Sequence, residues 1–439
     1  MTDGGAMFRL ALRSIRYRAG SFLASLLTLT LGAVILMTFA ALLDTSAAAD
    51  AQTATTLTIM ASVVGGWGLV IVTFAAASTL TLQVRQRSTE MALLRTVGAT
   101  PAQIRRLVLI ESVTLALIAV LIALVPSRLT SGVLVELLKD AHQVPADLPA
   151  AFGPIAVSVG LGVTLASAVL AALLAARRAA TTRQPGRGRA RLIAGVAVLV
   201  AGISSGATVM VAFDGTEPAV MAVSGQGAIL CAIGLALLSP PIITAIATLL
   251  TPLRGVSGYL TAVNLRGHTH QMATALAPII LFTGLATGTL YMQRIENESG
   301  TPMPAHMAPT IETLNYVVVG MVTLFAAVML INTVIAATLH RRREFGQLRL
   351  AGSTRPQVLG MVSTEASVLA CTGVLFGTLA ATATVIPYSV VKTGSLLPDT
   401  TITTYLAVIL TAAALTLITT VASARRATGQ PAIDTVRVS

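Results

Sequence analysis

The chain has 439 residues, of which 55% are hydrophobic and 10% charged, and its mean hydropathy is +0.84. Because a soluble domain carries about 25% charged residues, this composition excludes a soluble domain and indicates an all-α integral membrane protein. The net charge of +12 raises the possibility of nucleic-acid binding, which the placement of the basic residues excludes below.

Ten apolar runs are each long enough to cross a bilayer, which takes about 20 helical residues. They cover residues 21–43, 57–82, 104–125, 152–176, 191–212, 219–250, 272–292, 317–339, 357–386 and 404–422. The sixth and ninth runs have room for an interfacial turn or a kink. Ser239-Pro240-Pro241 marks the expected kink in the sixth run, because proline removes a backbone donor and clashes with the preceding turn. The longest loops on one side, 126–151 and 293–316, are too short for an independent domain.

The basic residues are divided unequally between the two sides of the predicted bundle. All but four of the 29 arginines and lysines lie on one side, in the termini and in alternate loops. The other side holds Arg128, Lys139, Arg294 and Lys392. The positive-inside rule therefore predicts that the arginine-rich side, with both termini, is cytoplasmic.

A basic segment occurs twice. "RQRSTEMALLRTVGATPAQIRRLVLIES" begins at Arg85, and "HRRREFGQLRLAGSTRPQVLGMVSTEAS" begins at His340. With an offset of 254 residues, the arginine, glutamate, leucine, glycine, threonine and glutamine positions coincide. We therefore expect two four-helix repeats, 1–180 and 255–439, joined by residues 181–254, which hold a basic linker and two extra spans. Both copies lie on the same side, so the repeats are parallel.

Each copy predicts a short amphipathic helix, a corner, and then a membrane helix. The apolar stripes are Met91, Leu94 and Val97 in the first copy and Phe345, Leu348 and Ala351 in the second. Gly98 and Gly352 suit the left-handed turn that ends a helix. Thr100 with Gln103, and Thr354 with Gln357, fit the capping box that begins the next helix.

The first segment resembles the signature of the FtsX-like (MacB-type) ABC transporter permeases, and the second segment is a more degenerate copy. Two such units joined by two extra spans are similar to the ten-span form of that family, although this chain lacks the large extracellular domain that the antimicrobial-peptide-resistance type has between spans seven and eight. The resemblance implies that the repeated helix is a coupling helix, which packs against a separate cytoplasmic ATPase, with two ATPase copies per chain. The residues implied to touch or shape that contact are Arg87, Glu90, Met91, Leu94, Arg95, Gly98, Arg341, Glu344, Phe345, Leu348, Arg349 and Gly352.

The resemblance implies a non-catalytic permease subunit in the bacterial plasma membrane. It would couple ATP hydrolysis on the partner to export or extraction of a lipid-like, amphipathic or peptide substrate. The alternative is a signalling permease that controls an extracellular hydrolase or a sensor kinase without transport. A third reading, an ion-driven carrier, is disfavoured because the spans contain almost no deep ionisable groups. No G-x-x-x-x-G-K-[ST] motif is present, so ATP and Mg are expected on the partner chain, with no cofactor or metal on this one.

Two glutamates lie inside predicted spans, Glu111 and Glu365, at equivalent positions of the repeats. An ionisable group in a span is a candidate functional site. Both lie about two turns past a predicted cap, however, so we expect each to pair with Arg105, Arg106 or another interfacial arginine.

Overall fold

The computed structural model describes residues 19–86, 93, 96–140, 142–180, 187–214, 219–249, 267, 269–299, 308–396 and 402–429. These ranges contain helices and no strands. The chain divides into two compact units, each described here by itself. Unit 1 comprises Met1–Gln184 and Pro302–Met321, and unit 2 comprises Pro185–Thr301 and Val322–Ser439.

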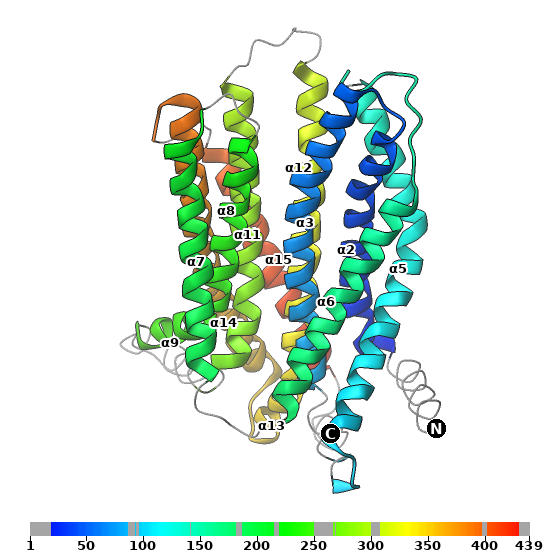
Figure 1. The fold of residues 1–439 in the computed structure, drawn as a ribbon. Helices are drawn as coiled ribbons and strands as arrows, with labels where there is room; N and C mark the ends of the chain where they lie inside the picture. The colour runs from blue at the N-terminus through cyan, green and yellow to red at the C-terminus, as the bar shows by residue number, and fades with distance from the viewer. Residues whose placement is uncertain are drawn as a thin grey trace, which may run out of the picture. The chain divides into compact units, whose positions relative to one another are not determined.

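Unit 1 contains four long helices (Figure 1). They enclose a core of small and branched side chains. They are α2 (Ala19–Ser46), α3 (Ala51–Gln86), α5 (Pro101–Asp140) and α6 (Pro154–Ala180). Helix α2 contacts the other three. Leu29 of α2 and Leu115 of α5 are buried among the alanines of α5 and α6, such as Ala116 and Ala168, which allow close approach of the helices.

Unit 2 repeats this arrangement and adds a helical hairpin. Its helices are α7 (Arg187–Ala212), α8 (Ala219–Leu237), α9 (Ser239–Leu249), α11 (Thr269–Glu298), the Val322–His340 part of α12 (Ala308–His340), α13 (Arg342–Leu350), α14 (Arg355–Thr393) and α15 (Ile402–Thr428). The core is formed by α11, α12, α14 and α15, with Leu276, Leu330, Leu369 and Val408 among its buried residues. The hairpin α7–α8 packs against α14, and α8 also packs against α11.

The described helices agree with the predicted spans, and the protein is a multi-pass membrane protein. Nine helices in the described ranges are long and apolar enough to cross a bilayer, and α12 covers the remaining predicted span, 317–339. The kink expected at Ser239-Pro240-Pro241 is confirmed, because α8 ends at Leu237 and α9 begins at Ser239. Helix α9 turns away from α8 and lies across one end of unit 2 (Figure 1).

Several predicted boundaries are wrong. Helix α5 continues through Pro126 to Asp140, so much of the predicted loop 126–151 is helical. The physical reason is packing: Leu134, Val135 and Leu138 are buried against Phe39 of α2 and Leu57 of α3. Helix α14 likewise runs from Arg355 to Thr393 as one helix, so of the two alternatives for the ninth run, a turn or a kink, the interfacial turn is wrong.

Two further boundaries differ. The predicted loop 293–316 is partly helical, because α11 continues to Glu298 and α12 begins at Ala308. The basic linker is shorter than expected, because α7 already begins at Arg187.

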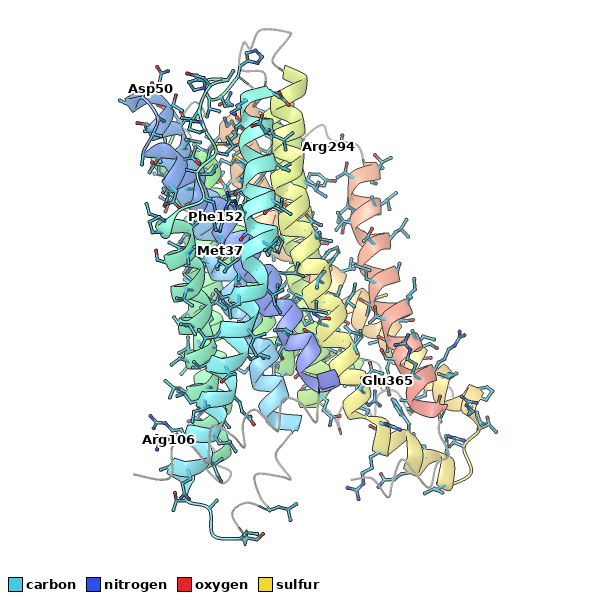
Figure 2. The ribbon with its side chains drawn as sticks, turned by 90° about the vertical axis from the view of Figure 1, so that its right-hand side faces the viewer. Met37, Asp50, Arg106, Phe152, Arg294 and Glu365 are labelled. Carbon is cyan, nitrogen blue, oxygen red and sulfur yellow. The ribbon has the colours of Figure 1, made fainter. Side chains whose placement is uncertain are left out.

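The segment that connects α5 to α6 is held by the end of α2, at the end of unit 1 far from Gly98. The Asp44 carboxylate accepts hydrogen bonds from the backbone N–H groups of Gly153, Ile155 and Ala156, at 3.0, 3.1 and 2.8 Å. These donors begin α6, so Asp44 caps it from another helix. Phe152 lies in this segment and packs in the cluster that contains Met37 (Figure 2).

Candidate functional site

The second copy of the repeated segment forms a corner of fixed geometry, residues 341–365, called the second elbow here. Its short helix α13 ends with Gly352 at φ +99°, where a residue with a Cβ is strained. The Gly352 N–H donates to the Arg349 carbonyl (3.1 Å) and the Ser353 N–H donates to the Leu348 carbonyl (3.0 Å). These two bonds form a Schellman motif, which ends a helix and sets the direction of the chain.

A capping box begins α14 immediately after this turn. Thr354 is the N-cap, and its backbone N–H donates to Gln357 Oε1 at 2.8 Å, while its side chain accepts from the backbone of Gln357. Both sides of the corner are therefore fixed by hydrogen bonds, and only Ser353 lies between the glycine and the cap.

The first elbow, residues 87–111, has the same turn and cap. Gly98 has φ +97°, the Thr100 N–H donates to Gln103 Oε1 (2.9 Å), and the Gln103 N–H donates to Thr100 Oγ1 (3.3 Å). Five of the residues implied by the resemblance lie outside the described residues: Arg87, Glu90, Met91, Leu94 and Arg95. Of the residues just before Gly98, Leu93, Thr96 and Val97 are described, and Leu93 and Val97 are 61% and 88% exposed.

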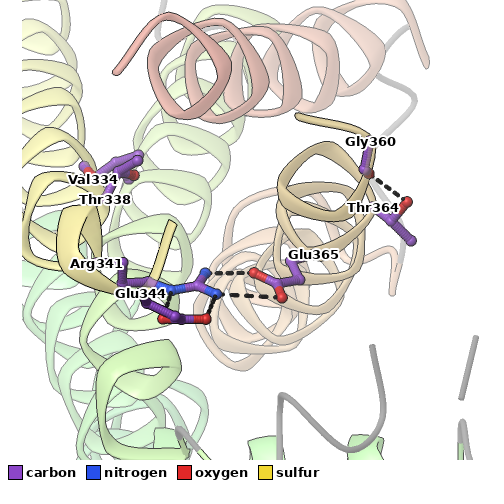
Figure 3. A network of polar contacts seen from close by, with 7 residues as sticks. All are labelled: Val334, Thr338, Arg341, Glu344, Gly360, Thr364 and Glu365. Atoms are coloured by element: carbon purple, nitrogen blue, oxygen red, sulfur yellow. Dashed lines mark hydrogen bonds and ion pairs between the residues drawn. The ribbon is translucent and has the colours of Figure 1, made fainter. Parts of the chain in front are cut away.

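Arg341 joins the start of α13 to the membrane helix α14 (Figure 3). Its Nε and Nη2 donate to the two oxygens of Glu344, at 2.9 and 2.8 Å. Its Nη1 and Nη2 donate to Glu365, at 2.5 and 3.5 Å. Arg341 and Glu365 are both buried. The expectation that an interfacial arginine pairs with Glu365 is confirmed, and the partner is the first residue of the elbow itself.

The surroundings of Arg341 stabilise the protonated, positively charged form of its guanidinium. Burial lowers the pKa of the guanidinium, but the hydrogen bonds to Glu344 and the charge of Glu365 outweigh burial and hold the pKa above its usual value. The guanidinium carbon also lies 5.3 Å from the centre of the Phe345 ring, a favourable cation–π distance. A cavity of about 30 Å³ beside Arg341 and Glu365 has room for one water molecule.

The apolar stripe of α13 faces the chain's own helices. Phe345 is 1% exposed and packs with Val358 and Val362 of α14 and with Ala424 of α15, and Leu348 borders the same cluster. Phe345 was implied to touch or shape the ATPase contact. Because the chain itself covers the ring, Phe345 can shape that contact through the position of α13, and this role stays a prediction. Phe345 and Leu348 fix α13 against α14 and α15.

The remaining implied residues of the second elbow also have roles within the chain. Arg349 Nη1 donates to the Thr428 carbonyl at 3.0 Å, at the end of α15, where a cation is favoured by the helix dipole. The face of α13 that is exposed consists of Arg343, Gln347 and Leu350. Sequence reasoning missed this face, because a periodic stripe identifies the buried side of a helix without saying which molecule buries it.

Glu111 lies at the position equivalent to Glu365 and is likewise buried, at 4% exposure. The two elbows thus share the glycine turn, the capping box and a buried glutamate ten residues after the first residue of the membrane helix.

The sequence family agrees with this repeated geometry. The family model described as FtsX-like permease C-terminal matches residues 62–183 and 316–432, which together make up more than half of the chain. The chain therefore belongs to the FtsX-like permease family. The two matched segments begin 254 residues apart, the same offset that aligns the two elbows. A comparison with curated proteins gave no match.

FtsX-like permeases are the membrane subunits of ABC-type transporters, and they typically pair with a cytoplasmic ABC ATPase. They are generally non-catalytic. Among the described residues, no three His, Cys, Asp or Glu side chains are grouped so that they could hold a metal ion.

Proposed function

We propose that this chain is a MacB-like, ten-span permease, in which the two elbows receive the motion of two copies of a cytoplasmic ABC ATPase. In this proposal ATP and Mg bind the ATPase, and the elbows and both termini lie on the cytoplasmic side of a bacterial plasma membrane. Closure of the ATPase pair displaces each elbow, and the membrane helix that follows it moves as one body with it.

The observation that supports this proposal is the rigid joint between α13 and α14. A glycine turn, a capping box, the Phe345 core and the Arg341 network all connect these two helices within 25 residues. A helix that only adsorbs to lipid headgroups requires an apolar face but no joint of this kind. A joint held by so many contacts transmits a displacement rather than absorbing it.

The partner contact is assigned to exposed residues that precede the glycine turn of each elbow. They include Leu93 and Val97 in the first elbow and Arg343, Gln347 and Leu350 in the second. The apolar members suit a groove on the ATPase, and Arg343 suits an acidic rim. The cargo, by the family resemblance, is a lipid-like, amphipathic or peptide substrate that is exported or extracted.

The test is purification of the chain from its own membranes, followed by identification of the proteins that accompany it. We expect the unaltered chain to carry an ABC ATPase with ATP-hydrolysing activity. We expect the double variant Val97→Asp/Leu350→Asp to lose both, because each substitution places a charge in a contact that is desolvated on binding. Leu396→Asp is the matched control, since Leu396 is also exposed but lies at the other end of α14.

The proposal is contradicted if the double variant keeps its ATPase, or if the unaltered chain is active without any nucleotide-hydrolysing partner. The circular dichroism spectrum and the thermal stability of the double variant should equal those of the Leu396→Asp control, because Val97, Leu350 and Leu396 are all exposed.

A further inference from the structure

Helices α5 and α14 can be compared residue by residue. Both begin at a capping box, at Thr100 and Thr354, and both run unbroken for about 40 residues. With the offset of 254, most of the buried positions coincide. The equivalent buried pairs include Val108 and Val362, Glu111 and Glu365, Ala123 and Gly377, Ser127 and Ala381, and Leu134 and Tyr388. The two helices therefore present equivalent faces to the cores of their units.

One face differs between them, in the half of each helix that lies far from its elbow, called the distal half here. In α14, Thr384 and Pro387 are buried. The equivalent residues of α5 are Thr130 and Val133, and Val133 is 58% exposed. Leu129, one turn before Val133, is 66% exposed. Unit 2 therefore covers a face that unit 1 leaves open.

The cover in unit 2 is a membrane helix. A Cβ built on Gly206 of α7 would lie 2.6 Å from the Ala383 carbonyl oxygen and 3.1 Å from Pro387 Cγ. Ala383 and Pro387 are the equivalents of Leu129 and Val133. Helix α7 thus lies directly on this face through a glycine, with no side chain between the two backbones.

The open face of α5 borders a preformed groove. The groove has a volume of about 730 Å³ and is lined by Val125, Leu129 and Val133 on successive turns of α5 and by Phe152 on its other side. The segment that carries Phe152 is held in place by the hydrogen bonds to Asp44 and by Thr45, whose hydroxyl binds Ala151. Gly132 lies in the groove, and a Cβ added there would meet nothing within 4 Å.

The charges in the groove suit a protein helix better than a lipid chain. The groove is also lined by Arg128, Glu136 and Asp140, which carry both signs. Within the described part of the chain Arg128 forms no ion pair, whereas Glu136 pairs with Lys139. An acyl chain has no polar group that could pair with the two carboxylates beside it. Side chains at the end of a membrane helix can pair both with these carboxylates and with the guanidinium.

We propose that this face of α5 is the docking site for one membrane-spanning helix of a second polypeptide. That helix presents a small residue to Leu129 and Val133, as Gly206 does in unit 2, and an acidic residue to Arg128. The site is separate from the elbows and does not depend on the ATPase, so its failure would leave the function proposed above intact.

The test uses the full chain in its own membranes, with the photoreactive residue benzoylphenylalanine in place of Val133. We expect a cross-link to a peptide that lies within the membrane span of another protein. Leu410 of α15 is the matched control position, because it is 66% exposed on an apolar helix outside the groove. We expect no such protein cross-link from Leu410.

Occupation of the groove is then tested by filling it. Gly132→Trp should abolish the cross-link from position 133, whereas Gly162→Trp should leave it unchanged, because a Cβ at Gly162 also meets nothing within 4 Å but lies in α6, outside the groove. Both variants should keep their bound ATPase. The proposal is overturned if position 133 gives no protein adduct, gives only lipid adducts, or reacts with the chain itself or a second copy. It is equally overturned if the cross-link survives in Gly132→Trp.

Discussion

Arg341 is the residue at which three parts of unit 2 meet. It follows α12, precedes α13, and binds Glu365 of α14. A buried ion pair adds little net stability, because desolvation of both charges offsets their attraction. Its effect is geometric: each carboxylate takes two of the fixed donors of the guanidinium, so α13 is held at one orientation to α14.

This view predicts an asymmetry between single and double substitution. Arg341→Met should lower the free energy of unfolding by about 3–5 kcal/mol, because Glu365 then remains buried without its cation. Adding Glu365→Leu should recover most of that loss, since an apolar pair of similar volume needs no charge compensation. Denaturant unfolding in detergent, followed by circular dichroism, measures both changes. A double variant as unstable as the single one would contradict the proposed pairing.

The sequence predicted part of this network. Glu365 was expected to pair with an interfacial arginine, because it lies close to a predicted helix start. The particular partner could not be predicted, because 24 residues separate Arg341 and Glu365. The pair forms only after α13 folds back on α14, and that step depends on burial of Phe345, which involves a third helix, α15.

At the scale of elements, α14 is a continuous helix, called a rod here, and side-chain hydrogen bonds connect it to its neighbours near both ends. Near the elbow, Glu365 binds Arg341. Near its distal end, Tyr388 donates a hydrogen bond to Glu296 of α11, and Lys392 Nζ lies 3.1 Å from the same carboxylate. At 1.5 Å per residue, positions 365 and 388 are about 35 Å apart, so the rod connects opposite sides of a bilayer.

Helix α14 should stop transmitting motion from α13 when the turn between the two helices becomes flexible. Two glycines inserted after Gly352 place two flexible residues between the Schellman motif and the capping box, and they leave the exposed face of α13 intact. We expect the ATPase to remain bound, and we expect the distal end of α14 to stop responding to nucleotide. The measurement is the rate at which an impermeant maleimide labels a cysteine placed at Leu396, in a Cys371→Ala background, with and without ATP.

The control for this insertion is the same pair of glycines after Ala48, in the turn between α2 and α3. That variant should keep the nucleotide-dependent labelling. If labelling at position 396 still follows nucleotide after insertion at Gly352, the corner does not carry the motion.

The lengths of the rods were underestimated from the sequence, for a reason that α5 makes clear. An apolar run marks only the part of a helix in which apolar residues are continuous, and that criterion ended the third span at residue 125. The continuation to Asp140 is about half polar and is stabilised by α2 and α3, which bury Leu134 and Leu138. Such packing depends on residues about 80 to 100 positions away, which a local pattern does not report.

At the scale of the whole molecule, the two repeats agree best in the described turns and caps of the elbows and differ more elsewhere. Both elbows have the glycine turn, the cap and the buried glutamate. Only unit 2 carries the α7–α8 hairpin on the face of its long helix. Each unit therefore has an equivalent elbow at the start of its long helix, whereas the distal surfaces of the two long helices differ.

Two equivalent elbows predict the number of ATPase copies and how that number changes. Native mass spectrometry of the purified complex should give two ATPases per chain. Val97→Asp and Leu350→Asp alter one elbow each, at side chains that are 88% and 55% exposed. Each single variant should therefore retain one ATPase. The measurement is made at a low nucleotide concentration, at which the two ATPase copies do not yet bind each other. A single variant that loses both copies, or keeps both, would show that the elbows are not two independent sites. Because the substituted side chains lie outside the packed cores, a loss of one copy can be assigned to the contact itself rather than to unfolding of the chain.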